Sequence, residues 1–329
     1  MTASVAQDAA EVENRSNDTG LDVVTGAFSY SGRAIAQVLG EHGRRVRTLT
    51  GHAGRADANS AVEIRPLDFS DSPGMVTSLL GATTLYNTYW VRFARGRADH
   101  AVAVENSRAL FHAARRAGVQ RIVHLSITNP SIESPYPYFR GKALVERALA
   151  ETGVAYTVLR PAILFGGDGI LINNIAWLLR HLPVFAVGGG GDYRIRAIHV
   201  EDLARLAVAA GASHGDAVLD AVGPERPTFL ELVQTIRGAV KSRAKIIRVP
   251  GIVVPAASAC LSLALRDVLL TGEEYRAMAD NLADTIGPAT GTTSITDWIA
   301  DNASVLGITY ANELNRHYQR PRTRACCVR

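Results

Sequence analysis

The chain has 329 residues, of which 47% are hydrophobic and 20% are charged, and its formal net charge at pH 7 is +4. This length allows one large α/β domain, or a nucleotide-binding domain with a smaller lobe, and the composition is ordinary for a protein with a well-filled core. No basic stripe with interleaved aromatic residues is present, so nucleic acid is not expected as a partner.

Both ends of the sequence are polar. Residues 1–20 carry several acids and no apolar run, so we interpret them as a disordered leader and not as a signal peptide. Residues 316–329 contain five arginines. We interpret them as a solvated basic tail, with contact to an acidic lipid surface as the alternative.

The three cysteines form neither a disulfide framework nor a metal-ligand cluster, so a reducing cytoplasm is the expected compartment and no metal site is expected. Cys260 belongs to the longest uncharged stretch, Val249–Leu265, which is shorter than the ~20 residues of a membrane-spanning helix. No transmembrane segment is therefore expected. We predict a buried or half-buried helix with Cys260 inside, and a surface facing a membrane is the alternative.

Short β-branched runs alternate with longer amphipathic stretches from residue 21 to about residue 160. Strands are predicted over 21–25, 45–50, 62–69, 82–90, 119–127 and 154–164, and helices over 30–43, 98–118 and 138–153. This alternation predicts βαβ crossovers and a parallel sheet covered on both faces.

The rhythm changes after Pro161. A loop and helix over 165–183 are expected outside the main sheet, and a turn and strand over 187–200 are expected to return to it. A helix over 198–211 and a last sheet strand over 217–223 follow, and the rest is predicted to be mainly helical.

A glycine pattern lies where the first strand meets the first helix. Gly26 and Gly32 are six residues apart, with Ser29 at the middle position of a G-x-x-G-x-x-G frame. Gly26 allows a sharp turn, Gly32 allows close helix packing, and the helix N-terminus offers N–H groups to a pyrophosphate. Ser29 departs from the pattern, because its side chain lies where close backbone approach is needed.

The end of the second strand bears on the choice between NAD and NADP. Thr50 stands where an NAD-specific site has an acidic residue for the ribose diol. Without that carboxylate a 2′-phosphate is not repelled, and Arg33 or Arg55 can pair with it, so NADP is favoured and NAD remains open. Ordinary surface charge is the alternative for both arginines. Asp68 is either an adenine contact or a loop-capping aspartate.

Tyr138 and Lys142 are spaced i, i+4 on a predicted helix and therefore share one face. A free tyrosine has a pKa near ~10, and a neighbouring ammonium lowers that pKa, which suits the pair to acid/base work. A hydroxyl of Thr128 or Ser126, at the end of the fifth strand, can hold a substrate oxygen.

With VTGAFSYSG, IVHLSIT, YFRGK, YTVLRPAILFGG and IHVEDLA in this order, the chain resembles the short-chain dehydrogenase/reductase superfamily over residues 21–222. It is most similar to the extended or atypical branch, the NAD-dependent epimerase/dehydratase family, which includes relatives of the complex I NAD(P)H-binding subunit and NmrA-like regulators. The resemblance implies a Rossmann-type doubly wound parallel sheet formed by residues 21–165 and 192–222. It also implies a small, mainly helical C-terminal substrate lobe formed by residues 166–191 and 223–315.

The resemblance also implies roles for single residues. Tyr138 would be the acid/base, and Lys142 would hold the nicotinamide ribose and lower the tyrosine pKa. Thr128 best matches the serine/threonine position of the family, with Ser126 second, and Pro161 would line the nicotinamide. The predicted cofactor contacts are Gly26, Phe28, Ser29, Tyr30, Gly32, Arg33, Thr50, Arg55, Asp68, Asn87, Lys142 and Pro161.

Substrate contacts are predicted at two places. Tyr89, Trp90 and Arg92 follow the fourth strand, at the edge where open α/β sheets bind ligands, although closure of the core explains aromatic residues there equally well. Asn173 and Asn174 lie in the inserted segment that contributes to the substrate lobe of the family.

The leading interpretation is an NADP(H)-preferring oxidoreductase that acts on a carbonyl or alcohol group of a small molecule. A redox-inactive NAD(P)H-binding sensor or assembly subunit is one alternative. A nucleotide-sugar-type epimerase with tightly bound NAD is another, and the short segment between Thr128 and Tyr138 disfavours it. A homodimer is common for this fold, and that expectation rests on analogy.

Overall fold

The computed structural model describes residues 20–51, 61–93 and 99–314. A seven-stranded, wholly parallel sheet has the order β10-β6-β5-β4-β1-β2-β3. The strands are β1 (Leu21–Thr25), β2 (Arg45–Thr50), β3 (Glu63–Pro66), β4 (Ala82–Asn87), β5 (Arg121–Leu125), β6 (Ala155–Pro161) and β10 (Ala217–Ala221). The predicted Rossmann-type α/β fold is thereby confirmed.

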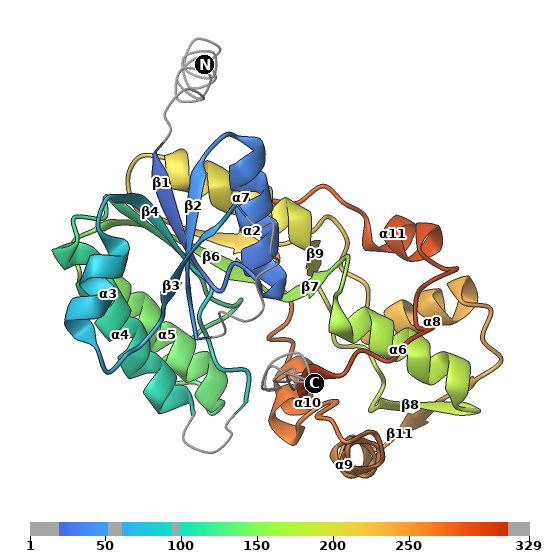
Figure 1. Cartoon of the computed structure of the whole chain (residues 1–329). Coiled ribbons are helices and arrows are strands. Elements are labelled where there is room, and N and C mark those ends of the chain that lie inside the picture. The colour runs from blue at the N-terminus through green and yellow to red at the C-terminus, as the bar shows by residue number, and fades with distance from the viewer. Residues whose placement is uncertain (1–19, 52–60, 94–98, 315–329) are drawn as a thin grey trace, which may run out of the picture.

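Helices cover both faces of this sheet (Figure 1). On one face lie α2 (Tyr30–Glu41) and α7 (Val200–Ala212), which bury Ile35 and Leu203. On the other face lie α3 (Ser72–Leu79), α4 (His100–Arg116) and α5 (Pro137–Ala150), which bury Phe111 and Leu149. Two apolar clusters thus hold the strands between two helical layers, as a parallel sheet requires.

The strand order reverses beside β1. From β1 the chain proceeds through β2 and β3 in one direction, and then returns to β4 and continues through β5, β6 and β10 in the other. The carboxyl ends of β1 and β4 therefore open a crevice, which is where open α/β sheets bind ligands.

A second apolar core holds the lobe beside the sheet. It packs α6 (Ile170–His181), α8 (Phe229–Ala239) and α11 (Ile295–Asp301) around Phe165 and Leu232. Two short parallel pairs belong to the same region, β7 (Ile163–Phe165) with β9 (Ala197–His199) and β8 (Val184–Gly188) with β11 (Lys245–Val249). The helices α9 (Val253–Leu265) and α10 (Gly272–Ala279) complete it.

One prediction about the elements was wrong, and three elements were missed. The strand after the glycine run is β9, which pairs with β7 and does not rejoin the main sheet. The strands β8 and β11 were not predicted, because each is only five residues long and its partner is far away in the sequence. The helix α3 was not predicted either, because Pro73 and Gly74 in its first turn conceal the cap that the Asp71 side chain forms on Gly74 N.

The uncharged stretch near residue 260 does form a helix, α9, and this helix is half-buried. Ser258 is its buried residue, whereas Ile252 just before it and Leu263 near its end are 86% and 82% exposed. Cys260 is exposed too, which corrects its assignment to the interior. Across the described residues no helix has both the length and the hydropathy to cross a membrane.

Candidate functional site

A cavity of about 1550 Å³ lies between the carboxyl ends of the sheet strands and the second lobe. It brings together ten of the predicted site residues: Gly26, Ser29, Tyr30, Thr50, Tyr89, Trp90, Arg92, Thr128, Tyr138 and Asn174. Much of the remaining wall is apolar and comes from the lobe, with Ile175 and Leu178 of α6, Phe185 of β8, and Leu261 of α9. One continuous space therefore reaches from the glycine loop to the predicted catalytic tyrosine.

The glycine loop has the shape that a phosphate cradle needs. Gly26 has a φ of +66°, and its N–H donates to Leu49 O at 2.9 Å. A Cβ atom added to Gly32 would lie 2.2 Å from Gly26 O, so only glycine permits this packing of α2. The helix begins at Tyr30 with no acidic residue in its first turn, and Ser29, Tyr30 and Ser31 line the cavity. Its positive end therefore faces the cavity, and the loop fits a pyrophosphate.

Ser29 is bound within this loop. Its hydroxyl donates to Gly26 O at 2.6 Å, and its N–H donates to the same carbonyl at 2.8 Å. The serine that departs from the glycine pattern therefore supports the turn. Tyr30 also has a local partner, because its hydroxyl donates to Gly166 O at 2.6 Å in the loop after β7.

Arg33 does not line the cavity. Its guanidinium pairs with Asp168 at 2.5 Å, and the two side chains are 56% and 57% exposed. Such exposed pairs are worth only about 0–1 kcal/mol, so Arg33 can exchange partners at small cost. Arg55, the second arginine considered for a 2′-phosphate, lies outside the described residues.

Four other predicted cofactor residues do not line the cavity. Asp68 accepts from the N–H and hydroxyl of Ser70, as a loop-capping aspartate does. Asn87 is fully buried and bonds Thr25 and His124. Pro161 accepts from Thr128 N at 3.1 Å, and its neighbours Ala162 and Ile163 form the wall there. Phe28, in the glycine loop, is half-buried and does not line the cavity.

Trp90 lies between Tyr138 and Lys142. Its ring meets the Tyr138 ring edge-on with centroids 5.7 Å apart, and Lys142 Nζ lies 4.6 Å from its centroid in a cation–π contact. A Cβ atom on Gly141 would come within 2.9 Å of the indole, so the helix is open to Trp90 between its two functional residues. His100 also stacks against the indole, with an interplanar angle of 8°.

The pKa shifts of Tyr138 and Lys142 differ from the expectation. Burial raises the pKa of Tyr138 above its ordinary range, Glu274 raises it further, and Arg92 opposes them. Burial lowers the pKa of Lys142 to about 7, and Glu146 opposes this. The predicted lowering of the tyrosine pKa by Lys142 is not present, because Lys142 Nζ donates to Leu125 O at 2.7 Å and is covered by Trp90.

The two hydroxyls at the end of β5 face opposite environments. Thr128 lines the cavity, and its hydroxyl donates to Leu282 O of the lobe at 2.8 Å. Ser126 donates to Glu146, which also holds Arg160, and it does not line the cavity. Thr128 is therefore the better placed of the two for contact with a ligand.

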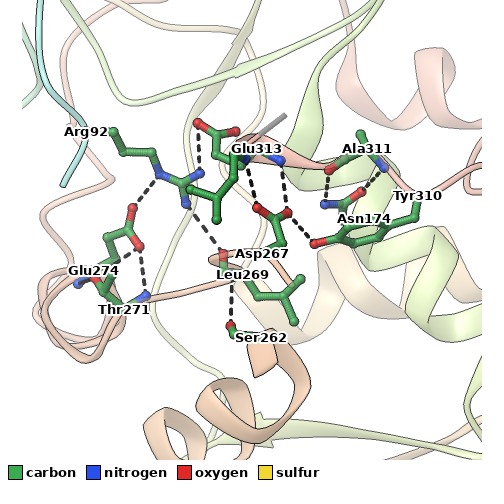
Figure 2. Close-up of polar contacts among 11 residues, drawn as sticks. Arg92, Asn174, Ser262, Asp267, Leu269, Thr271, Glu274, Tyr310, Ala311 and Glu313 are labelled. Atoms are coloured by element: carbon green, nitrogen blue, oxygen red, sulfur yellow. Dashed lines mark hydrogen bonds and ion pairs between the residues drawn. The ribbon is translucent and has the colours of Figure 1, made fainter. Parts of the chain in front are cut away.

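Arg92 joins the cavity wall to the second lobe. Its guanidinium contacts Glu274 at 2.7 Å and Glu313 at 3.3 Å, and these carboxylates raise its pKa although burial acts to lower it. Tyr89, on the same segment, accepts a bond from Asn106 at 2.8 Å. Arg92 is thus held by an ion-pair network at the cavity rim (Figure 2).

The two asparagines of α6 hold the C-terminal segment, residues 307–314. The Asn174 amide bonds both the N–H and the carbonyl of Ala311, and Asn173 bonds Gly307 N and Thr309 O. Asp267 accepts from Tyr310 Oη at 2.6 Å and from Glu313 N at 2.9 Å on the same segment (Figure 2). These contacts give both asparagines a structural role, and Asn174 also lines the cavity.

Sequence reasoning missed several residues around the cavity. His100 and Glu274 carried no motif for ligand binding, although T-G-E-E at 271–274 is a capping-box sequence and forms one. Glu313 and Asp267 owe their roles to partners far away in the chain. No local signal identifies such residues.

The family described as NAD(P)H-binding matches residues 26–213. The mitochondrial NADH dehydrogenase [ubiquinone] 1 alpha subcomplex subunit 9 of Arabidopsis thaliana is 24% identical over 69% of this chain, and a photosystem II assembly factor of Cyanidium caldarium is 26% identical over 57%. Both alignments span 60% of the relative's own length.

The fold is shared with solved structures of reductases. The NADPH-dependent quinone oxidoreductase of Escherichia coli, complexed with NADPH, superposes with a TM-score of 0.71. The superposition covers 86% of this chain and 98% of that one, at 20% identity. At that identity the likeness establishes a common fold.

Proposed function

Because the chain belongs to the NAD(P)H-binding family, we propose that it is an NADP(H)-preferring oxidoreductase that acts on a carbonyl or alcohol group of a small, largely apolar molecule. The observation that carries this proposal is the single cavity shared by the glycine loop and Tyr138. Gly26, Ser29 and Ser31 would hold the pyrophosphate, and the apolar wall of the lobe would hold the substrate.

A nicotinamide bound at this site would supply or accept hydride. Tyr138 has a neutral phenol throughout the physiological pH range because burial raises its pKa, so it is a proton donor in the direction of carbonyl reduction. Thr128, with its hydroxyl at the same wall, would orient the substrate oxygen. Lys142 is held close beneath Trp90. In this proposal Lys142 binds the ribose of the nicotinamide.

The test is consumption of NADPH with a panel of apolar aldehydes, ketones and quinones, comparing the wild type with Tyr138→Phe. We expect Tyr138→Phe to lower kcat by about 10²–10⁴-fold, because the phenolic proton is lost, and to leave the NADPH affinity unchanged. Equal turnover by both proteins would remove Tyr138 from the mechanism.

A second candidate function is a binding subunit without turnover. The names of the relatives, a subunit of NADH dehydrogenase and a photosystem II assembly factor, favour it. A protein that binds NADPH, consumes none with any member of the panel, and co-purifies in a stable complex would support this candidate over the oxidoreductase.

A further inference from the structure

The helix α9 presents two different faces. Val254, Ser258 and Leu261, spaced i, i+4, i+7, line the cavity. The hydroxyl of Ser258 donates to Leu270 O at 2.8 Å and so ties this face to the segment before α10. The inner face therefore belongs to the site already described, and it fixes the orientation of the helix.

The outer face is apolar and exposed. It is formed by seven exposed residues: Ile252, Ala256, Ala259 and Leu263, spaced i, i+4, i+7 and i+11, with Val253, Cys260 and Ala264 beside them. None of these side chains is polar except the thiol, and Ile252 and Leu263 stand at opposite ends of the face. Ile247 of β11, 42% exposed, adds an apolar side chain on a neighbouring strand. In Figure 1, α9 lies beside β8 and β11 at the margin of the lobe.

Cations surround this surface in the sequence, and acids are missing. Residues 232–266 contain six cationic residues and no Asp or Glu. The six are Arg237, Lys241, Arg243, Lys245, Arg248 and Arg266, and all are exposed. Within the described part of the chain none of them forms an ion pair. Arg248 precedes α9 by five residues, and Arg266 is its C-cap, in a left-handed conformation with φ 51°.

We propose that α9 and the neighbouring strands dock the protein on an anionic phospholipid surface. An apolar helix face flanked by unpaired cations fits the boundary of a bilayer, where the side chains enter the acyl region and the cations remain among the headgroups. At 13 residues α9 can lie on a bilayer but not span it. Because its inner face lines the cavity, the docked protein would have that cavity next to the bilayer.

The experiment is flotation of the full-length protein with two kinds of vesicle, one of phosphatidylcholine alone and one of equal parts phosphatidylcholine and phosphatidylglycerol. The wild type should bind the anionic vesicles at least tenfold more strongly, and added salt should weaken that binding. The double variant Ile252→Asp, Leu263→Asp should bind the anionic vesicles at least tenfold more weakly than the wild type, because two carboxylates then lie on the docking face. Lys245→Gln with Arg248→Gln should reduce the preference for anionic vesicles.

The matched control is Ile286→Asp. Ile286 is 88% exposed, so the same change is made at an equally open position away from α9. This variant should float like the wild type, and all variants should keep the wild-type melting temperature and NADPH affinity, which separates loss of docking from loss of the fold.

Three results would overturn the proposal. The first is a wild type that floats with neither vesicle. The second is a double variant that floats as well as the wild type, because lipid binding would then belong to another part of the chain. The third is a wild-type dimer that the double variant converts to a monomer without any lipid binding, since a second copy would then cover the face.

Discussion

Lys142 shows how burial sets the properties of a single residue in this site. Its side chain is 3% exposed, and its pKa falls to about 7 because the ammonium is removed from water. One carbonyl at 2.7 Å and the face of Trp90 replace its hydration only in part. The i, i+4 spacing predicted that Lys142 shares a helix face with Tyr138, but spacing could not predict that an indole from the segment after β4 would lie between them.

This burial predicts a pH dependence of stability. The pKa of Lys142 is about 7 in the folded chain and 10.5 when the side chain is in water, so between these values the unfolded chain binds more protons and stability rises with pH. From pH 7.5 to pH 9 the free energy of unfolding should rise by about 2 kcal/mol relative to that of Lys142→Met. Urea titrations of both proteins across this range measure it, and parallel curves would contradict the prediction.

Arg33 and Asp168 allow a direct test of the choice of cofactor. Arg33→Ala should weaken NADPH binding by about tenfold and leave NADH binding nearly unchanged, because a 2′-phosphate loses a charged partner. Asp168→Asn is the matched variant, since it releases Arg33 from its ion pair. It should strengthen NADPH binding. Fluorescence titrations with both nucleotides give the ratio of the two affinities. Equal losses of affinity for NADPH and NADH would assign the 2′-phosphate to other residues.

At the scale of elements, prediction succeeded where the signal was local. The glycine loop and the strand–helix alternation are written in contiguous residues, and β1, β2, α2 and α5 were located within a few positions of their observed ends. It failed where an element depends on a remote partner. The strands β8 and β11 stabilise each other from 57 or more residues apart, as Val184 pairs with Lys245 and Gly188 with Val249. Neither run reads as a strand alone.

The C-terminal segment is the clearest case of such a remote partnership. Asp267 is 5% exposed and accepts bonds from Tyr310 Oη, Glu313 N and Leu314 N. The sequence contains no motif that joins these residues. The segment nevertheless places Glu313 in the cavity wall, where it pairs with Arg92.

Asp267→Ala should therefore release this segment. Three donors lose their charged acceptor, so we expect a loss of about 3 kcal/mol in unfolding free energy and faster proteolysis after residue 308. Asp301→Ala, at an exposed position of α11, is the control and should behave like the wild type. Unchanged proteolysis of Asp267→Ala would show that Asn173 and Asn174 hold the segment without it.

For the molecule as a whole, the fold and a nucleotide site at the strand switch point could be predicted, because strand alternation and a glycine loop constrain topology strongly. The surroundings of Tyr138 could not be predicted in the same way. It depends on how Trp90, His100 and the lobe carboxylate Glu274 surround Tyr138, and these residues come from separate parts of the chain. The cavity exists only where the two lobes meet.

We propose that this cavity binds a nicotinamide dinucleotide at the N-terminus of α2, and the variant Ser31→Asp tests this binding. Ser31 lines the cavity in the first turn of α2. A carboxylate there suits the helix dipole and repels a pyrophosphate, so it separates binding from folding. In a fluorescence titration with NADPH we predict binding well below the millimolar range for the wild type. For Ser31→Asp we predict at least tenfold weaker binding at an unchanged melting temperature. Equal affinity of the two proteins, or no wild-type binding below the millimolar range, would contradict the account.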